Sequence, residues 1–227
     1  SDRISSQLCM DKGRAKTKVA EVGVNGAPDC YFQDPESVDL ENILSELGND
    51  LVIKPIDQGS SVALFVIRGR EEFQNALSTI DEGNWMIERR IFGREMTVGV
   101  LRGESMGVVE VIPDGGVYDF KRKYSAGATE YRYPAVLPLD LENGLKRNAE
   151  IVFQHCGCRD FARVDFIVCE DGHAHFLEIN TLPGLTSTSL LPKSASCSGY
   201  DFQSLAMRLV EPAVDRFAQS VGNLLET

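Results

Sequence analysis

Apolar side chains recur along this chain at two spacings, one typical of a helix and one typical of a strand. Helical spacing predicts helices at about residues 14–22, 38–47, 70–77, 141–156 and 200–225, the last as one or two helices. Short apolar runs between turn residues predict strands at about residues 51–54, 62–67, 85–92, 95–101 and 107–112. The polar segment 113–138 predicts a long ordered loop of the kind that covers a functional site. Together these elements predict an α+β fold in which antiparallel sheets carry helices on one side.

The clearest alternation of apolar and polar residues lies at 163–180, on both sides of Asp171 and Gly172. Asp-Gly is a strong hairpin signal, because a two-residue primed turn needs positive φ at both central positions. If Glu170 faces His173 across this turn, the two residue numbers of every cross-strand pair add up to the same total. The register of the whole hairpin can therefore be calculated.

This register places Asp165 opposite Glu178 and Arg163 opposite Asn180. Because like charges directly opposite each other repel, the two carboxylates need a neutralising group, and Arg163 supplies one positive charge. The oxygens of Asp165, Glu178 and Asn180 form an oxygen-only ligand set, which suits magnesium that also binds substrate phosphates. The alternative is an exposed hairpin whose charges are solvated separately.

Composition limits the classes of function. With 227 residues, 43% of them hydrophobic and 25% charged, the chain has material for one or two domains of an ordinary globular protein. Its net charge of −11 argues against a nucleic-acid partner. Because no apolar run reaches the length of a membrane span and no secretory signal is evident, we expect a cytoplasmic location and no membrane partner. The six cysteines fit no zinc spacing and are interpreted as reduced, structural thiols.

The turn at Gly59, Ser60 and Ser61 has the chemistry of a phosphate-binding segment. It offers consecutive backbone N–H groups and two hydroxyls between predicted strands. Lys54, at the end of the preceding strand, adds a charge of the sign that phosphates need. A solvated lysine at a strand end is the alternative interpretation of Lys54.

Two further pairs of residues suit a nucleotide. Glu88 and Glu95 flank a turn between predicted strands, where carboxylates could accept hydrogen bonds from an adenine amino group and from ribose hydroxyls. Surface charge is the alternative for both. Lys123 and Tyr124, in the long polar loop, could reach a phosphate and a hydroxyl network on the nucleophile's side, although an isolated Lys-Tyr pair has little meaning.

Residues 181–190 directly follow the hairpin and are rich in hydroxyl side chains. The turn at Pro183 and Gly184 exposes backbone N–H groups that can stabilise an oxyanion, and the nearby serines can hold a carboxylate. An ordinary loop rich in serine and threonine is the alternative. The order in which all these segments follow one another favours the functional interpretation.

In this order the segments resemble the ATP-grasp part of the D-alanine–D-alanine ligase family. The resemblance runs from about residue 9 to the end of the chain. It rests on the motifs Met10-Asp11-Lys12, Val52-Ile53-Lys54-Pro55 with Gly59-Ser60-Ser61-Val62, Ile87-Glu88 through Gly93-Arg94-Glu95 with Thr97-Val98, Tyr118-Asp119 with Lys123-Tyr124, Ala162-Arg163-Val164-Asp165, and Leu177-Glu178-Ile179-Asn180-Thr181 with Pro183-Gly184 and Thr186-Ser187. It implies two α+β subdomains whose antiparallel sheets sandwich ATP, residues 1–90 with the phosphate-covering loop and residues 91–227 with the metal and substrate site.

The resemblance also implies a role for each residue at a matching position. Residues implied to bind ATP are Lys12, Lys54, Ser61, Glu88, Glu95 and Lys123, with the lysines on phosphates and the two glutamates on adenine and ribose. Two Mg²⁺ or Mn²⁺ ions would be held by Asp165, Glu178 and Asn180. The implied catalytic groups are Ser60, Tyr124, Arg163 and the N–H of Gly184, and Ser189 would hold the carboxylate of the second substrate.

The implied reaction joins two D-alanines for peptidoglycan precursors. ATP phosphorylates the carboxylate of one D-alanine, and the amine of the second attacks the acyl phosphate. Tyr124 favours a dipeptide over an ester-linked product. Family members carry an additional N-terminal domain whose acidic residue binds the first D-alanine, and nothing before Met10 can supply it. We therefore expect a fragment, either a proteolytic product or a part of a larger polypeptide fused to an upstream domain, and a homodimer when complete. Alone, it should bind ATP and magnesium better than it makes product.

Two positions depart from the family pattern. Gln58 replaces an acid and Ala63 replaces a glycine, which puts the closure of the phosphate loop in question. One alternative function is that of another ATP-grasp carboxylate–amine ligase with a different amino acid. A second alternative is a non-catalytic nucleotide-binding module.

Overall fold

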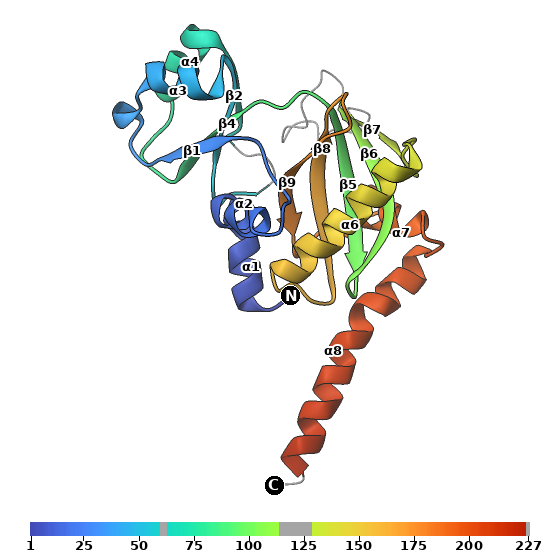
Figure 1. Ribbon diagram of the computed structural model, residues 1–227. Helices are drawn as coiled ribbons and strands as arrows, with labels where there is room; N and C mark the ends of the chain where they lie inside the picture. The colour runs from blue at the N-terminus through green and yellow to red at the C-terminus, as the bar shows by residue number, and fades with distance from the viewer. Residues whose placement is uncertain (60–62, 114–128, 226–227) are drawn as a thin grey trace.

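The computed structural model describes residues 1–59, 63–113 and 129–225 and arranges them around two antiparallel sheets (Figure 1). The first sheet has four strands in the order β1-β4-β2-β3, and the second has five in the order β7-β6-β5-β8-β9. Helices pack against both sheets, which confirms the predicted α+β class. No helix within the described ranges is long and apolar enough to cross a membrane.

The first sheet packs one face against short helices. Its strands are β1 (Asp29–Phe32), β2 (Asp50–Pro55), β3 (Phe65–Arg68) and β4 (Trp85–Arg89), and the helices are α3 (Leu40–Leu47), α4 (Gly69–Leu77) and the 3-10 helix η1 (Pro35–Ser37). Strand β2 alternates, so Leu51 and Ile53 are buried against α3 and α4, and Val52 and Lys54 face the other way. The second face of this sheet is therefore available to line a site.

The second sheet packs helices on both faces, whereas helices on one side were predicted. Its strands are β5 (Arg94–Leu101), β6 (Glu104–Pro113), β7 (Thr129–Arg132), β8 (Phe161–Val168) and β9 (Ala174–Asn180). Helix α6 (Leu139–His155) covers one face, with α1 (Arg3–Met10) and α2 (Lys12–Ala20) beside β9. Helix α7 (Leu190–Ser196) covers part of the opposite face. The predicted subdomain boundary at residue 90 falls in the connection between the sheets and stays a prediction.

Two glycines allow α7 to approach the sheet closely. A Cβ atom on Gly99 would lie 2.9 Å from the Leu191 side chain, and one on Gly107 would lie 2.1 Å from Cys197 Cβ. The hydroxyl of Ser194 fastens the helix there, since it accepts a hydrogen bond from Gly99 N at 2.9 Å and donates one to Gly107 O at 2.5 Å. This packing fixes the position of the segment that leads into α7.

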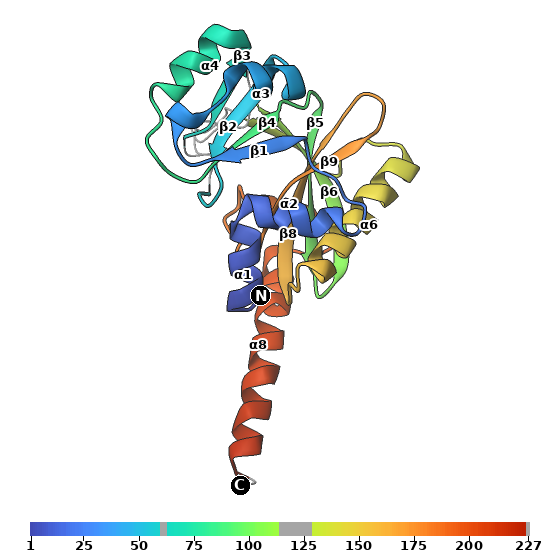
Figure 2. The same cartoon turned by 60° about the vertical axis from the view of Figure 1, so that its left-hand side comes forward.

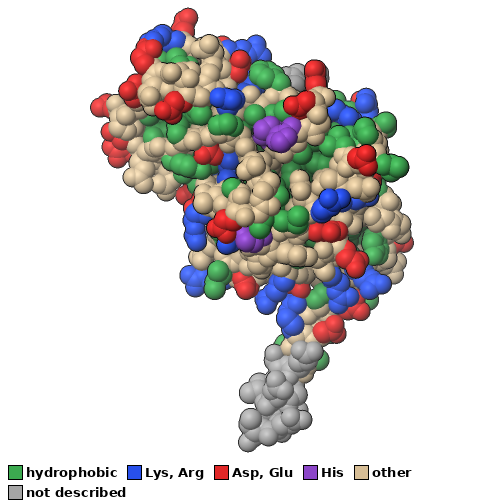
Figure 3. Space-filling view, viewed as in Figure 1, with side chains coloured by type: hydrophobic (Ala, Val, Ile, Leu, Met, Phe, Trp, Pro, Cys, Tyr) green, Lys and Arg blue, Asp and Glu red, His purple; other side chains and the backbone are tan. Residues whose placement is uncertain are grey.

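Helix α8 (Phe202–Leu225) extends away from both sheets, as two views of the molecule show (Figures 1 and 2). Arg216 on this helix joins Asp160 through two hydrogen bonds of 2.6 and 2.9 Å. Many of the acidic side chains lie over the helices of the first sheet (Figure 3), at exposed positions such as Glu41, Glu46 and Glu72. The net negative charge is therefore carried in good part by surface away from the space between the sheets.

Several predicted boundaries need correction. Strand β7 lies within residues 113–138, for which a loop was predicted, and β4 ends at Arg89 rather than at residue 92. Helix α2 begins two residues early because the Asp11 carboxylate accepts a hydrogen bond from Arg14 N at 2.9 Å and caps it. The described elements that the sequence did not predict are α1, β1, η1, β7 and α7, and each is eight residues or shorter. Such lengths are too short for a periodic pattern to be recognised.

The β8–β9 hairpin has a different turn from the predicted one. Cys169 N donates to His173 O at 2.9 Å, so the loop contains the three residues 170–172, and the predicted facing of Glu170 and His173 is wrong. Gly172 takes the positive φ, 84°, that a three-residue hairpin loop requires near its end. The extra loop residue shifts the register next to the turn by one.

A second irregularity restores the predicted register at the far end of this hairpin. Phe166 pairs with Phe176, but Asp165 pairs with Glu178, so Leu177 is an additional residue in β9 and forms a bulge. The bulge cancels the shift that the turn introduces. Asp165 therefore lies opposite Glu178, and Arg163 opposite Asn180, as predicted, although the calculation assumed the wrong turn.

Candidate active site

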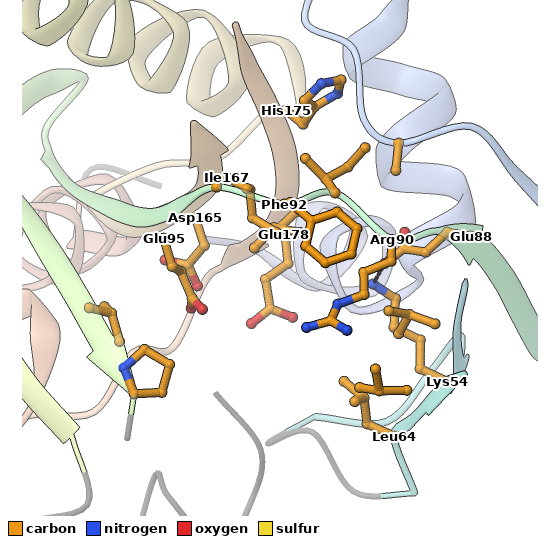
Figure 4. Close-up of a pocket in the computed structure, with 18 of the residues that line it drawn as sticks. Lys54, Leu64, Glu88, Arg90, Phe92, Glu95, Asp165, Ile167, His175 and Glu178 are labelled. Atoms are coloured by element: carbon orange, nitrogen blue, oxygen red, sulfur yellow. Dashed lines mark hydrogen bonds and ion pairs between the residues drawn. The ribbon is translucent and has the colours of Figure 1, made fainter. Parts of the chain in front are cut away.

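A cavity of about 400 Å³ lies between the two sheets (Figure 4). Its apolar lining includes Val52, Val66, Phe92, Ile167 and Leu177, and its charged lining includes Lys12, Lys54, Glu88, Arg90, Glu95, Asp165 and Glu178. The connection from β4 to β5, residues 90–93, closes one side. A mainly apolar cleft with a few convergent charged groups is typical of a site for a small molecule.

Glu88 lies between two lysines at the first sheet's side of the cavity. Its carboxylate accepts a hydrogen bond from Lys16 Nζ at 3.1 Å and pairs with the ammonium of Lys54. Glu88 is 6% exposed, and burial alone would raise its pKa, but the charges and hydrogen bonds of Lys54 and Lys16 hold the pKa below its usual value. The carboxylate is therefore ionised and its position is fixed by both lysines.

Lys16 is a residue of this cluster that the sequence analysis missed. It lies on α2, is 6% exposed, pairs with Asp29 of β1, and donates to Ala27 O at 2.8 Å. It thereby joins the helices on the second sheet to the strands of the first. Its position four residues after Lys12 could have suggested it, because residues at this spacing share one face of a helix.

Lys12 stands at the first position of α2, beside the chain that leaves β2. Its Nζ atom donates to Gln58 O and lies 3.5 Å from Ile56 O, and its backbone N donates to Ile56 O at 3.1 Å. These contacts hold α2 against the segment that leads to the predicted phosphate loop. Ser60 and Ser61 of that loop lie outside the described residues, as do Lys123 and Tyr124.

Arg163 and Asp165 form a bidentate pair on β8. Arg163 Nε and Nη2 donate to the two carboxylate oxygens of Asp165 at 2.9 and 2.8 Å, and the hydroxyl of Thr97 donates to the same carboxylate. Arg163 Nη2 lies 4.0 Å from Glu178 Oε1, which also accepts a hydrogen bond from Asn180 Nδ2 at 3.1 Å. The structure thus brings together all four residues predicted from the hairpin.

Asp165, Glu178 and Asn180 fit a magnesium site by the chemistry of their donor atoms. Among the described residues, no group of three or more His, Cys, Asp or Glu side chains could hold a metal ion. The set here has two carboxylates and a carboxamide, so further oxygens would come from water and phosphate, which magnesium commonly retains. The side chains of Asp165 and Glu178 are 7% and 26% exposed, and both line the cavity.

Glu95 begins the inner face of β5, and Figure 4 shows its carboxylate beside that of Asp165. The preceding residue, Arg94, forms a bidentate pair with Glu110 at 2.7 and 2.8 Å. Glu95 is therefore positioned at the edge of the cavity opposite Glu88, at the other end of the β4–β5 connection.

Gly184 and Ser189 lie together in the segment before α7, outside the residues that line the cavity. Ser189 Oγ accepts a hydrogen bond from Thr186 N at 3.0 Å and lies 2.8 Å from Thr186 Oγ1. A Cβ atom on Gly184 would lie only 2.7 Å from Ser189 Oγ. We call residues 184–189 the hydroxyl loop; its own side chains close it into a compact turn.

Two buried polar atoms that line the cavity have no hydrogen-bond partner in the described part of the chain. They are Nη1 of Arg90 and Nδ1 of His175. The Arg90 guanidinium lies over the ring of Phe92 at 4.7 Å, and Figure 4 shows it reaching into the space between Glu178 and Lys54. A polar ligand between Glu178 and Lys54 would lie within reach of the Arg90 guanidinium, whereas Figure 4 shows the His175 ring turned away from these charged groups.

Comparisons with known proteins agree with this geometry. The family model described as D-ala D-ala ligase C-terminus matches residues 20–211. A D-alanine--D-alanine ligase of Geobacter sulfurreducens is 38% identical over 210 residues, which cover 91% of this chain and 66% of that protein. The chain therefore spans about two thirds of this relative.

Solved structures of two ligases share the fold. The D-alanine--D-alanine ligase from Bacillus anthracis complexed with ATP has a TM-score of 0.81 at 26% identity, over 97% of this chain and 71% of that one. The VanG D-Ala:D-Ser ligase from Enterococcus faecalis has a TM-score of 0.82 at 29% identity, over 92% of this chain and 63% of that one.

Two antiparallel sheets that enclose a cavity lined by lysines and carboxylates define the ATP-grasp class. Within this class, the chain belongs to the D-alanine–D-alanine ligase family and corresponds to the C-terminal region that the family model describes.

Proposed function

We propose that the protein to which this chain belongs uses ATP to join two D-alanines into D-alanyl-D-alanine, a precursor of peptidoglycan. One observation carries the proposal. The cavity between the sheets brings Lys54 and Glu88 of the first sheet to face Glu95, Asp165 and Glu178 of the second. A nucleotide needs this distribution, with a polar group for the base at one end and a charged environment for the phosphates at the other.

The nucleobase would lie among the apolar side chains of the cavity, with its amino group on Glu88 and the ribose on Glu95. Lys54 would then turn from Glu88 toward a phosphate, joined by Lys12 from α2. Lys16 would remain on Glu88 and keep it ionised, because it pairs with the carboxylate from the side of α2. The adenine amino group would replace one of the two cationic partners of Glu88.

The metal ligands would be Asp165, Glu178 and Asn180. When magnesium is bound, it neutralises negative charge on the phosphoryl group in transfer. Arg163 already holds both oxygens of Asp165 and lies beside Glu178, so it fixes the direction of both carboxylates. From the same position its guanidinium can stabilise the charge of the tetrahedral intermediate, together with the N–H of Gly184.

The chemistry would proceed in two steps. The carboxylate of the first D-alanine attacks the γ-phosphorus of ATP, which gives an acyl phosphate and ADP. The amine of the second D-alanine then attacks the acyl carbon, the C–O bond breaks, and phosphate leaves as the amide forms. Ser60, Ser61, Lys123 and Tyr124 are proposed to cover this site and to exclude water, which would hydrolyse the acyl phosphate.

A second candidate function differs only in the amino acid that attacks. The observation that favours it is the likeness to a D-Ala:D-Ser ligase, at 29% identity. The hydroxyl loop is proposed to hold the carboxylate of this substrate at Ser189, and a carboxylate contact alone does not select the side chain.

The full-length protein tests the proposal. Phosphate release is measured with ATP, magnesium and a panel of D- and L-amino acids, and the products are identified by mass spectrometry. We expect release with D-alanine alone and a product of the mass of D-alanyl-D-alanine. Release only with another pair would contradict this substrate assignment, and no release with any pair, despite measurable ATP binding, would support a non-catalytic module.

A further inference from the structure

Lys193 is a buried lysine of α7 that the proposed reaction does not use. The residue is 9% exposed. Its Nζ atom donates to Ser187 O at 3.3 Å and lies 4.7 and 5.8 Å from the ring centres of Tyr131 and Tyr133. Burial lowers the pKa of Lys193. The ammonium is therefore enclosed by two aromatic rings and one carbonyl of the hydroxyl loop.

No carboxylate pairs with this ammonium among residues 1–59, 63–113 and 129–225. Lys16, the other lysine of the described residues with so little exposure, has two carboxylates, Glu88 and Asp29. A buried cation without a counter-charge is unfavourable, and an ammonium has three N–H donors, of which Ser187 O takes one. Aromatic faces offset part of that penalty. An anionic ligand would offset the rest.

The position of Lys193 places this charge beneath the hydroxyl loop. Lys193 is four residues after Ser189, so the two residues share one face of the chain as it enters α7. Its contact with Ser187 O lies inside the loop, next to the Ser189 side chain that accepts from Thr186 N. Movement of the ammonium would therefore move the backbone that presents Ser189.

We propose that Lys193 is a positioning residue for the second substrate. It holds the Ser187 carbonyl and supplies the hydroxyl loop with the positive charge that favours an amino-acid carboxylate at Ser189. This inference rests on the proposed function and deepens it, because it assigns the electrostatic part of second-substrate binding to a residue outside the ATP cavity. Lys193 does not contact the reacting atoms.

Steady-state kinetics of the full-length protein test this role, with separate Michaelis constants for ATP and for the first and second D-alanine. Lys193→Met removes the charge and the hydrogen bond, and we expect a rise of about tenfold in the constant for the second D-alanine. The constants for ATP and for the first D-alanine should stay within about twofold. Lys193→Arg keeps the charge and should restore most of the affinity.

Two further variants separate charge from packing. Lys193→Gln keeps a donor for Ser187 O but removes the charge, so it should also raise the Michaelis constant for the second D-alanine. If Lys193→Met does not fold, Lys193→Gln takes its place in the test. Lys18→Met is the matched control, because Lys18 is an exposed lysine paired with Glu21 on α2. It should change none of the three constants.

The inference is overturned if Lys193→Gln leaves the constant for the second D-alanine unchanged, or if all three constants rise together, as they would after general loosening of the fold. Failure of the proposed function has a different signature. The wild-type protein would then form no D-alanyl-D-alanine at all, whereas failure of this inference leaves an active wild type and variants equal to it.

Discussion

The two sheets present different charge clusters to the same cavity. On the first sheet's side, two lysines, Lys16 and Lys54, face two carboxylates, Asp29 and Glu88, so positive and negative groups are equal in number. On the second sheet's side, the carboxylates of Glu95, Asp165 and Glu178 line the cavity, and the guanidinium of Arg163 pairs with Asp165 and lies beside Glu178.

The first cluster is neutralised by its own side chains, whereas the second suits a bound cation. In the first cluster each buried charge has an opposite charge as its partner, so the cluster joins α2 to β1, β2 and β4 without a ligand. In the second, the carboxylates of Asp165 and Glu178 line the cavity, and the Glu178 side chain is 26% exposed to it. We therefore expect mutations in the first cluster to act mainly on stability, and mutations in the second to act mainly on ligands and turnover.

The largest expected effect is that of Glu88→Gln on folding. The change leaves Lys16 and Lys54, whose side chains are 7% and 12% exposed, without their shared carboxylate. Removal of one partner from a buried ion pair costs about 3–5 kcal/mol, and we expect the free energy of unfolding in urea to fall by that amount.

The matched control for this prediction is Glu21→Gln. Glu21 pairs with Lys18 and His155, but its side chain is 52% exposed, so we expect a much smaller loss than for Glu88→Gln. Equal losses for the two variants would show that the first cluster does not stabilise the fold, and the contrast between the clusters would disappear.

Arg163→Ala should have the next largest effect, on turnover. Loss of one group that stabilises developing charge lowers turnover about 100-fold or more, so we expect a reduction of this size in the full-length enzyme. The Michaelis constant for ATP should change by less than about threefold. A parallel loss of ATP affinity and turnover, measured in the same assays, would mean that Arg163 acts only by holding Asp165 in place.

Glu178→Gln should weaken binding of the nucleotide in the presence of magnesium. The change removes a charged oxygen ligand while it preserves shape, and we expect the affinity measured by calorimetry to fall about tenfold to 100-fold. In EDTA the variant and the wild type should bind ATP equally. If the variant keeps the wild-type affinity in magnesium, the metal assignment at Glu178 is wrong.

The sequence predicted the second cluster far better than the first. Asp165 and Glu178 belong to one hairpin, so their pairing follows from local alternation and a turn signal. Even so, the prediction succeeded because two errors cancelled: the loop has one residue more than assumed, and the bulge at Leu177 restores the count. Neither feature is visible in the alternation of apolar residues, since a bulge changes the pairing and not the composition of a strand.

The first cluster could not be predicted because its members are far apart in the chain. Lys16 and Glu88 are separated by 72 residues, and Asp29 lies on a strand of four residues without a periodic pattern. Lys193 is similar, since its partners Tyr131 and Tyr133 lie in the segment 113–138, for which only a loop was predicted. Contacts of this kind depend on how the sheets and helices pack, and the spacing of residues along one element does not specify that packing.

The smallest expected effect, and the most specific for the first cluster, is a dependence of the Glu88→Gln loss on pH. Because Lys54 and Lys16 lower the folded-state pKa of Glu88, its carboxylate stabilises the fold above the unfolded-state pKa, and this contribution is lost as the pH falls through the folded-state pKa. The difference in unfolding free energy between wild type and Glu88→Gln should therefore be constant near neutral pH and shrink as the pH is lowered below the ordinary glutamate range. The difference in unfolding free energy between wild type and Glu21→Gln, measured in the same buffers, should change much less with pH because Glu21 is exposed. A difference for Glu88→Gln that stays constant into strong acid would mean that the variant is destabilised by altered packing, and that the two lysines do not hold the charge of this carboxylate.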